Sequence, residues 1–532
     1  MTGSCSSFLR VFFVISVALA GLGQEANTAP SQEPVTTFQS TTRLVVLDVV
    51  VTDKRGRPVR NLSKDDFTIF EDDKQQTIDS FEAPDQHAPV AIVADGQNAG
   101  TSPEIGPPKM GAQPLTILVF DALDTKIVDQ AYARAEINKY LVAHGPTLTQ
   151  PTALMALEEK RLELLHDYTR DAKALEQALR QHKAQLPFRL LRSMGEGNAY
   201  SLTDPTDAEQ RLLDAMLALR EIATANAQFA GRKNVIWIGP GFPGLNGFRV
   251  WNEAGFRRLE QSKATPSKKL NLLRWEQETL GLIWNARISV YTIDPRGGAA
   301  FPEEAMTPAS GDLVFEQIAP LTGGRIIRET NDVDARIGKS VDEGGAYYAI
   351  AYYPVNRDWN GRFRRVRIAV RNPELTAYTR DGYYAVPNSA PTPQELNQWL
   401  SLAVLNPLSY HSLEVQAGAR LSGSQQQTAH ITVNIDANQL HWETPESGKQ
   451  RCEITIMTAG FSTKGDVVAH AIKELEVVVD EKKQTQLLAK GMVIKLAMLL
   501  PATAVRMRIV ARDSTNGNMG TADLTPEGEQ FH

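Results

Sequence analysis

The sequence has very little cysteine. Only Cys5 and Cys452 occur in 532 residues, and Cys5 lies in an N-terminal segment that we expect to be removed. Cys452 is then alone, which excludes an internal disulfide in the mature monomer. Its surroundings, RCEITIM, predict a buried strand residue and not a reactive thiol. Stability must therefore come from the burial of apolar side chains.

The sequence also lacks an apolar run long enough to cross a membrane as a helix. Its longest run, VFFVISVALAGLG at 11–23, falls short of the roughly 20 residues that a spanning helix needs. Arg10 precedes the run, small residues end it, and no cysteine follows, as is typical of a secretory signal peptide without a lipid anchor. We predict a signal peptide at 1–23, with cleavage near Ala20 or Gly23, and a secreted or periplasmic product without a transmembrane segment. A buried strand is the alternative interpretation of this run.

Concentrated positive charge is absent. The formal net charge is -6, whereas a nucleic-acid partner requires a strongly basic surface. The locally basic stretch RFRRVRIAVR alternates arginines with apolar residues, which predicts a half-buried strand with a solvated face. Nucleic acid is therefore not an expected partner.

Motifs of the common enzyme classes are missing as well. The nine histidines show no His-Glu-x-x-His spacing, and neither a Gly-x-Ser-x-Gly elbow nor a phosphate-loop lysine occurs. Nothing in the sequence assembles a nucleophile, a base and an orienting acid. We therefore predict no catalytic residues, no organic cofactor and no enzymatic activity.

The pattern of apolar residues predicts several domains. Short β-branched runs broken by turns indicate a β module at 43–86, and a stretch rich in Pro, Gly, Ala and Gln indicates a linker at 87–114. Residues 346–386 return to strands and are too short to fold alone, so we expect them to pack with 43–86. Residues 394–526, after a Pro-containing joint, carry repeated strands that predict a C-terminal β sandwich.

Between these β regions, residues 115–345 alternate buried strands with helices. Predicted strands are LTILVF, NVIWIG, ARISVYTID and GRIIRE, and predicted helices include IVDQAYARAEINKYLVAH and the run from Asp204 to Phe229. The segment TALMALEEKRLELLHDY favours a hairpin that turns at Glu158-Glu159-Lys160, with a helix as the alternative. Buried strands joined by helices predict a doubly wound, mostly parallel α/β sheet covered on both faces.

Several phrases in the same order resemble the von Willebrand factor A-related domain proteins of acidobacteria. They include RLVVLDVVVTDKRGRPVRNLSKDDFTIFEDDKQQTI, ILVFDALDT, GRKNVIWIGPGFPG, ARISVYTIDPRGG, IAPLTGGR and YYAIAYYPVNRDWNGRFRRVRIAV, and the similarity runs from about residue 43 to 386. The resemblance implies an exported protein with an A-type α/β domain. It implies much less about function, because such proteins have diverse or unknown roles.

The resemblance also implies a place for a cation. In A domains the first strand ends in Asp-x-Ser-x-Ser, which binds a Mg²⁺-type ion together with a threonine and a second aspartate. Here Asp121 matches the first ligand and Thr125 stands for the second hydroxyl, but Leu123 offers no oxygen. At the end of the strand NVIWIG, the expected acidic position reads Gly239-Pro240-Gly241, with no carboxylate. With two oxygen donors missing, we expect a degenerate metal site at Asp121 and Thr125, with Mg²⁺ as the only candidate ion.

Alternatives remain for the other donors. Asp124 is a candidate replacement ligand, and Thr169, Thr203 and Thr206 are all candidates for the distant threonine. The alternative interpretation makes Asp121 a helix cap or a partner of loop amides. NRDWNGR at 356–362 imitates a calcium loop, but Arg367 stands where a glutamate is needed, so we predict a hairpin turn.

Three functional hypotheses follow. The first is adhesion or assembly with a protein or cell-envelope component through strand-end loops that contain Asp121, Asp124, Pro240, Gly241 and Phe242, with or without a cation. The second makes the A-type domain a scaffold and gives binding to the C-terminal sandwich. The third, an enzyme, requires a site that the sequence does not display.

Overall fold

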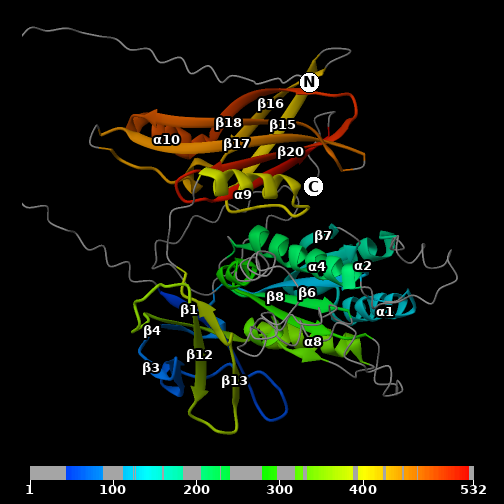
Figure 1. Ribbon diagram of the computed structural model, residues 1–532, viewed down its shortest axis with the longest axis vertical. Coiled ribbons are helices and arrows are strands. Elements are labelled where there is room, and N and C mark those ends of the chain that lie inside the picture. Colours follow the sequence, from blue (N-terminus) through cyan, green and yellow to red (C-terminus); the bar gives the residue numbers. More distant parts are fainter. Residues whose placement is uncertain are drawn as a thin grey trace, which may run out of the picture. The chain divides into compact units, whose positions relative to one another are not determined.

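The computed structural model describes most of the chain after residue 43. The described residues are 44–87, 112–123, 125, 127–158, 161–183, 205–227, 229, 231–239, 278–295, 318–327, 332–386, 393–422, 427–445, 448–463 and 465–525. Their strands form one mixed and four antiparallel sheets. The fold is therefore α/β with additional all-β parts, as the sequence predicts (Figure 1).

The mixed sheet has the strand order β10-β9-β8-β5-β6-β7. Its strands are β5 (Leu115–Asp121), β6 (Thr147–Glu158), β7 (Arg161–Asp171), β8 (Lys233–Ile238), β9 (Ile288–Ile293) and β10 (Ile326–Ile327). All neighbours run parallel except β7, which pairs antiparallel with β6. Glu158 pairs with Arg161, so the predicted hairpin is confirmed and the helical alternative for this segment is wrong; Glu159 and Lys160 of the predicted turn lie outside the described residues.

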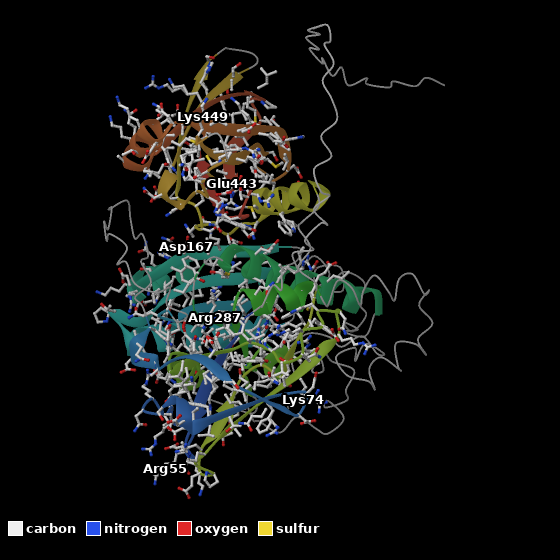
Figure 2. All side chains as sticks on the ribbon, turned by 90° about the vertical axis from the view of Figure 1, so that its left-hand side faces the viewer. Arg55, Lys74, Asp167, Arg287, Glu443 and Lys449 are labelled. Atoms are coloured by element: carbon white, nitrogen blue, oxygen red, sulfur yellow. The ribbon has the colours of Figure 1, made fainter. Side chains whose placement is uncertain are left out.

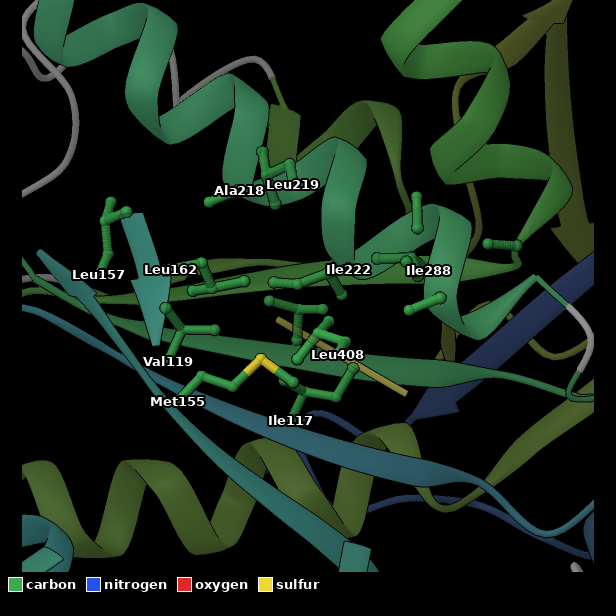
Figure 3. Packing of buried hydrophobic residues seen from close by; sticks show 14 of the residues in the cluster. Ile117, Val119, Met155, Leu157, Leu162, Ala218, Leu219, Ile222, Ile288 and Leu408 are labelled. Carbon is green, nitrogen blue, oxygen red and sulfur yellow. The ribbon is translucent and has the colours of Figure 1, made fainter. Parts of the chain in front are cut away.

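Helices cover both faces of this sheet, because side chains along each strand point alternately to opposite faces. One apolar layer joins Leu118 and Phe120 to α1 (Ile127–His144), α2 (Ala172–Gln181) and α8 (Val333–Gly344). The other joins Ile117 and Val119 to α4 (Pro205–Asn226) and to Ile283 (Figure 3). The β5, β8 and β9 strands are consequently buried along their whole length.

Strands from both sides of the α/β region make two further sheets. The first has the order β13-β1-β11-β4, with β1 (Val45–Thr52), β4 (Ile78–Glu82), β11 (Tyr347–Tyr352) and β13 (Thr376–Tyr378). The second has the order β14-β12-β2-β3, with β2 (Phe67–Glu71), β3 (Lys74–Gln76), β12 (Phe363–Val370) and β14 (Gly382–Tyr384). Their facing apolar side chains form one cluster.

A buried ion pair lies within this β module. Arg364 on β12 and Glu71 on β2 approach to 3.1 Å, and their side chains are 3% and 2% exposed. Tyr352 and Tyr383 each donate a hydroxyl hydrogen bond to Glu71 Oε2, at 2.7 and 2.8 Å. Arg364 also donates to the carbonyls of Asn356 and Asp358. Every charge is thus compensated, as burial of charged groups requires.

The same contacts correct the interpretation of NRDWNGR. The strands that flank it, β11 and β12, belong to different sheets, so the segment connects two sheets and is not a hairpin turn. The carbonyl oxygens of Asn356 and Asp358 accept hydrogen bonds from the Arg364 guanidinium. A cationic side chain therefore takes up oxygens that a calcium loop would offer to an ion.

A second ion pair ties the β module to the α/β region. The guanidinium of Arg287, which lies just before β9 and is labelled in Figure 2, pairs with the Asp48 carboxylate on β1. Burial raises the pKa of Asp48, but the charge and hydrogen bonds of Arg287 outweigh burial and hold it below its ordinary value. Arg232 adds a bond to the Asp48 carbonyl at 3.4 Å. The pair therefore links sequence-distant strands.

The C-terminal part has two sheets around one apolar cluster. Their orders are β15-β16-β19 and β18-β17-β20-β21. The strands are β15 (Val415–Ser422), β16 (Gln427–Ile435), β17 (Gln450–Ser462), β18 (Val467–Val479), β19 (Met492–Leu500), β20 (Ala504–Asp513) and β21 (Met519–Leu524). Cys452 on β17 is 1% exposed, and burial raises its pKa to about 12. It is a core residue, as predicted.

Two helices of this part were not predicted from the sequence. α9 (Pro393–Leu405) begins with a proline, at a position where a missing amide costs nothing. α10 (Glu481–Lys490) begins after Asp480, whose carboxylate accepts from Lys483 N at 2.7 Å. Both carry local helix signals that the surrounding strand pattern obscured.

The segment TAYTRDGYYAV at 376–386 forms two short strands, β13 and β14, which lie in different sheets.

No helix among the described residues has both the length and the apolar character that membrane crossing requires. The predicted signal peptide and the 88–111 part of the predicted linker lie outside the described residues.

Breaking the Glu71–Arg364 pair from one side should be costly. Arg364→Met leaves Glu71 buried without its cation, so we expect the free energy of unfolding to fall by about 3–5 kcal/mol. The double variant Glu71→Gln/Arg364→Met removes both charges and should recover much of that loss. Urea unfolding of the three proteins measures this, and equal stability of the single and double variants would contradict it.

Glu221 on α4 gives a pH-dependent prediction. Burial raises the pKa of this carboxyl from 4.5 to about 7. The folded chain therefore keeps a proton in this range that the unfolded chain has released, so this group makes stability fall as pH rises from about 4.5 to 7. Glu221→Gln should remove a pH-dependent change in the free energy of unfolding of about 3 kcal/mol across that window. Urea unfolding at several pH values tests it; parallel pH profiles for the two proteins would refute it.

Candidate functional site

The predicted site begins at the carboxyl end of β5. This strand lies in the middle of the mixed sheet, between β8 and β6. Open α/β sheets bind ligands at the carboxyl ends of their strands, and Asp121 is the last residue of β5. The sequence prediction therefore places Asp121 at the edge of the sheet where a ligand site is expected.

The Asp121 side chain is turned into the protein. Its residue is 0% exposed, and its Oδ2 accepts a hydrogen bond from the indole Nε1 of Trp237 at 3.1 Å. Trp237 lies on β8 and is itself 0% exposed. One carboxylate oxygen is therefore held by a neutral donor inside the apolar layer that contains α4. An oxygen used in this way is not presented to an ion at the surface.

Gly239 explains why no acid follows β8. A Cβ atom placed on Gly239 would lie 2.6 Å from the Asp121 Cβ and 2.8 Å from its Oδ2. Contacts that short are not tolerated, so any side chain at 239 would displace Asp121. The close packing of these two strand ends therefore excludes a second carboxylate at 239 in this arrangement.

The loop after Asp121 is also drawn inward. Leu123 is 1% exposed and belongs to the apolar layer on the α4 side. Gln130 of α1 donates from Nε2 to the carbonyls of Ala122 and Thr125, at 3.0 and 2.8 Å. Thr125 is 4% exposed, and its buried Oγ1 has no hydrogen-bond partner in the described chain. α1 thus holds the loop through hydrogen bonds to the loop's backbone carbonyls, and these bonds involve no cation.

The remaining predicted site residues divide into two groups. Asp124, Pro240, Gly241, Phe242 and Thr203 lie outside the described residues, as does the side chain of Thr206. Thr169 is described and is not near Asp121: it pairs with Thr152, which pairs with Thr116 near the amino end of β5. Thr169 is therefore wrong as the distant ligand, because it lies toward the opposite end of the sheet.

A second polar cluster, which the sequence did not reveal, lies at the tip of the β6–β7 hairpin. It consists of Glu158, Glu163 and His182, whose ligand atoms all lie within 4.8 Å of one another. The His182 Nε2 and Glu158 Oε1 atoms are 2.9 Å apart, with side chains 3% and 4% exposed. The predicted turn located Glu158, but no sequence spacing connects it with a histidine at the end of α2.

Arg134 of α1 fixes this cluster from the other side. Its NH1 lies 2.8 Å from His182 Nδ1. Its NH2 donates to the His182 carbonyl at 2.8 Å and to the carbonyl of Leu179. Guanidinium nitrogens only donate, so His182 Nδ1 accepts and the ring proton resides on Nε2, facing Glu158. The chain Arg134–His182–Glu158 thus has one defined hydrogen-bond direction.

The two polar groups face opposite sides of the sheet. Asp121 contacts Trp237 in the layer with α4. Glu158 lies on the same face of β6 as Leu154 and Ala156, which pack in the layer of α1 and α2. It contacts His182, just after α2, and His182 in turn contacts Arg134 of α1. Asp121 and Glu158 end neighbouring strands, since Asp121 pairs with Leu157, yet they cannot share one ion.

Comparisons with known proteins give distant structural matches only. No family model and no curated protein matches the sequence. The TFIIH p34 N-terminal domain is 17% identical; the match covers 43% of this chain and 96% of that domain, with a TM-score of 0.20. The VWA domain of SpRpn10 is 10% identical, with 34% and 88% covered and a TM-score of 0.14. Both are distant matches to von Willebrand A-like domains.

A third similar structure is a glycosyl hydrolase family 2 member from Bacteroides cellulosilyticus. It is 10% identical over 34% of this chain, with a TM-score of 0.16, and the chain covers 19% of that protein. Because all of these TM-scores are low, the fold class is assigned from the strand order of the chain itself.

The Asp121–Trp237 contact makes a stability prediction. Asp121 is fully buried, so its substitution should change stability. Removing the acceptor of the Trp237 indole should cost about 1–3 kcal/mol. Asp121→Asn keeps an oxygen of the same size and should cost less. Thermal or urea unfolding compares the variants, and an Asp121→Ala protein as stable as wild type would contradict the buried contact.

Proposed function

We propose that this chain is an exported, non-enzymatic binding protein whose A-type domain engages a protein or a cell-envelope component. The contact surface consists of the loops that follow β5 and β8, at the carboxyl edge of the mixed sheet. Export is inferred from the charged start and short apolar run at the N-terminus, which match a signal peptide. The absence of catalytic motifs from the sequence favours binding over catalysis.

The observation that carries this proposal is the inward position of Asp121. Its Oδ2 is held by the Trp237 indole, and the tight contact with Gly239 leaves no room for a second acid. A hard cation that bridges to a partner needs several oxygens in near-octahedral positions. Without such a set of oxygens, the shape and polarity of the loops that follow β5 and β8 must select the partner. We therefore favour recognition without a cation at this edge over a divalent-cation-dependent adhesin.

A specific feature favours a second candidate, binding by the C-terminal sandwich. Val493 and Leu499 on β19 are 57% and 60% exposed. Both point away from the cluster between the two sheets, because buried and exposed positions alternate along β19. Contiguous exposed apolar surface marks contact sites, and Val493 and Leu499 lie on the same face of β19, with Lys495 and Ala497 between them. In this alternative the A-type domain is a scaffold.

Two matched variants separate these candidates. The loop variant combines Asp124→Ala with Phe242→Ala, and the sandwich variant combines Val493→Ser with Leu499→Ser. Each full-length protein is immobilised and incubated with solubilised envelope fraction from the producing cells, with and without EDTA. We expect the loop variant to retain less of the captured component by at least about tenfold, with the sandwich variant and EDTA having little effect.

Other outcomes reject the proposal in different ways. Loss of capture only in the sandwich variant would transfer the binding role to the C-terminal part. Loss with EDTA in the wild type would restore a cation-dependent mechanism. Unfolding curves for both variants establish that each loss reflects the surface and not the fold.

A further inference from the structure

The cluster at the tip of the β6–β7 hairpin has the composition of a metal site. Glu158, Glu163 and His182 bring two carboxylates and one imidazole within 4.8 Å of one another. We propose that these three residues bind a divalent transition-metal ion of the Zn²⁺ or Mn²⁺ type. This site differs in residues and in sheet face from the degenerate position at Asp121, and it does not depend on the proposed binding function.

The fold holds the three side chains from rigid elements. Glu163 pairs across the hairpin with Ala156, two residues before Glu158 on β6, so both glutamates project from the same sheet face. His182 directly follows α2, which begins just after its capping residue Asp171. α2 in turn packs against the same face through Leu175 and Leu179. Sites on strands and helices keep their geometry better than sites on loops.

The donor set selects the ion. Carboxylates and imidazole together suit Zn²⁺ and Mn²⁺, whereas Mg²⁺ prefers oxygen ligands alone. Three protein ligands leave at least one coordination position for water or for a ligand from another molecule. The side chains of Glu158 and His182 are 4% and 3% exposed. The Glu158 carboxylate and the His182 imidazole are therefore already largely removed from water.

Arg134 weakens ion binding at His182, and this makes the proposed site testable by mutation. A metal bound at His182 Nε2 takes the position of the ring proton, which must move to Nδ1. Metal-bound histidines normally donate this second proton to an acceptor, but Nδ1 faces the Arg134 NH1 at 2.8 Å. Ion binding therefore requires Arg134 to leave the imidazole, and with it the carbonyls of Leu179 and His182 at the end of α2. The ion and the arginine compete for His182.

The Arg134→Gln variant distinguishes this mechanism from simple surface binding. A glutamine carbonyl accepts the Nδ1 proton that the arginine repels, so the variant should bind Zn²⁺ and Mn²⁺ about 10- to 100-fold more tightly than wild type, the usual size of such effects. His182→Ala and Glu158→Gln should weaken binding by about 100-fold or more. Arg180→Gln and Glu176→Gln, which change an exposed pair on the same helix, are the matched controls and should bind as wild type does.

Calorimetric titration of the full-length chain with Zn²⁺ or Mn²⁺ alone measures these affinities. Unfolding curves with and without the ion show whether it binds the folded state, since such an ion raises stability by an amount that grows with the logarithm of its concentration divided by its Kd. One ion per chain, lost in His182→Ala and Glu158→Gln and strengthened in Arg134→Gln, is the expected result. A wild-type Kd weaker than about 1 mM, or binding unchanged in folded His182→Ala and Glu158→Gln, overturns the proposal.

Discussion

The central constraint on the α/β region is that its middle strands are covered on both faces. β5, β8 and β9 are buried at every position. Each of their side chains must therefore pack within the layer on one face of the sheet or the layer on the other. This explains why Asp121, the only acid on β5, bonds to an indole from the neighbouring strand. It also explains why Gly239 must lack a side chain. The edge of the sheet is shaped by packing before any ligand is considered.

Much of this architecture could be predicted from the sequence. Fully apolar runs such as LTILVF and NVIWIG have no polar face, which is compatible only with a strand buried between layers. The helical spacing in Ile127–His144 and Pro205–Asn226 is equally direct, and the elements appear with nearly the predicted bounds. Local sequence signals gave the wrong prediction in two places. α9 and α10 were missed because strands surround them in the sequence. NRDWNGR has the composition of a hairpin turn, although its flanking strands lie in different sheets.

The candidate sites were less accessible to sequence reasoning. The pattern Asp121-Ala-Leu-Asp-Thr125 located one strand end correctly, but which way the carboxylate turns depends on Trp237, more than a hundred positions away. Glu158, Glu163 and His182 meet only because a hairpin tip and a helix end lie on one face. The direction of the hydrogen bond through His182 depends on Arg134 in yet another helix. Such contacts follow from tertiary packing and have no signature in spacing.

The pairing of β4 with β11 has a mechanical consequence. These strands carry the chain out toward the α/β region and back from it, and Glu82, the last residue of β4, pairs with Ala349 near the start of β11. Both connections thus leave the β module at the same end of two antiparallel neighbours. Tension applied through the α/β region would load those strands from that one end and open their hydrogen bonds in succession, as a zipper opens, and not all together in shear.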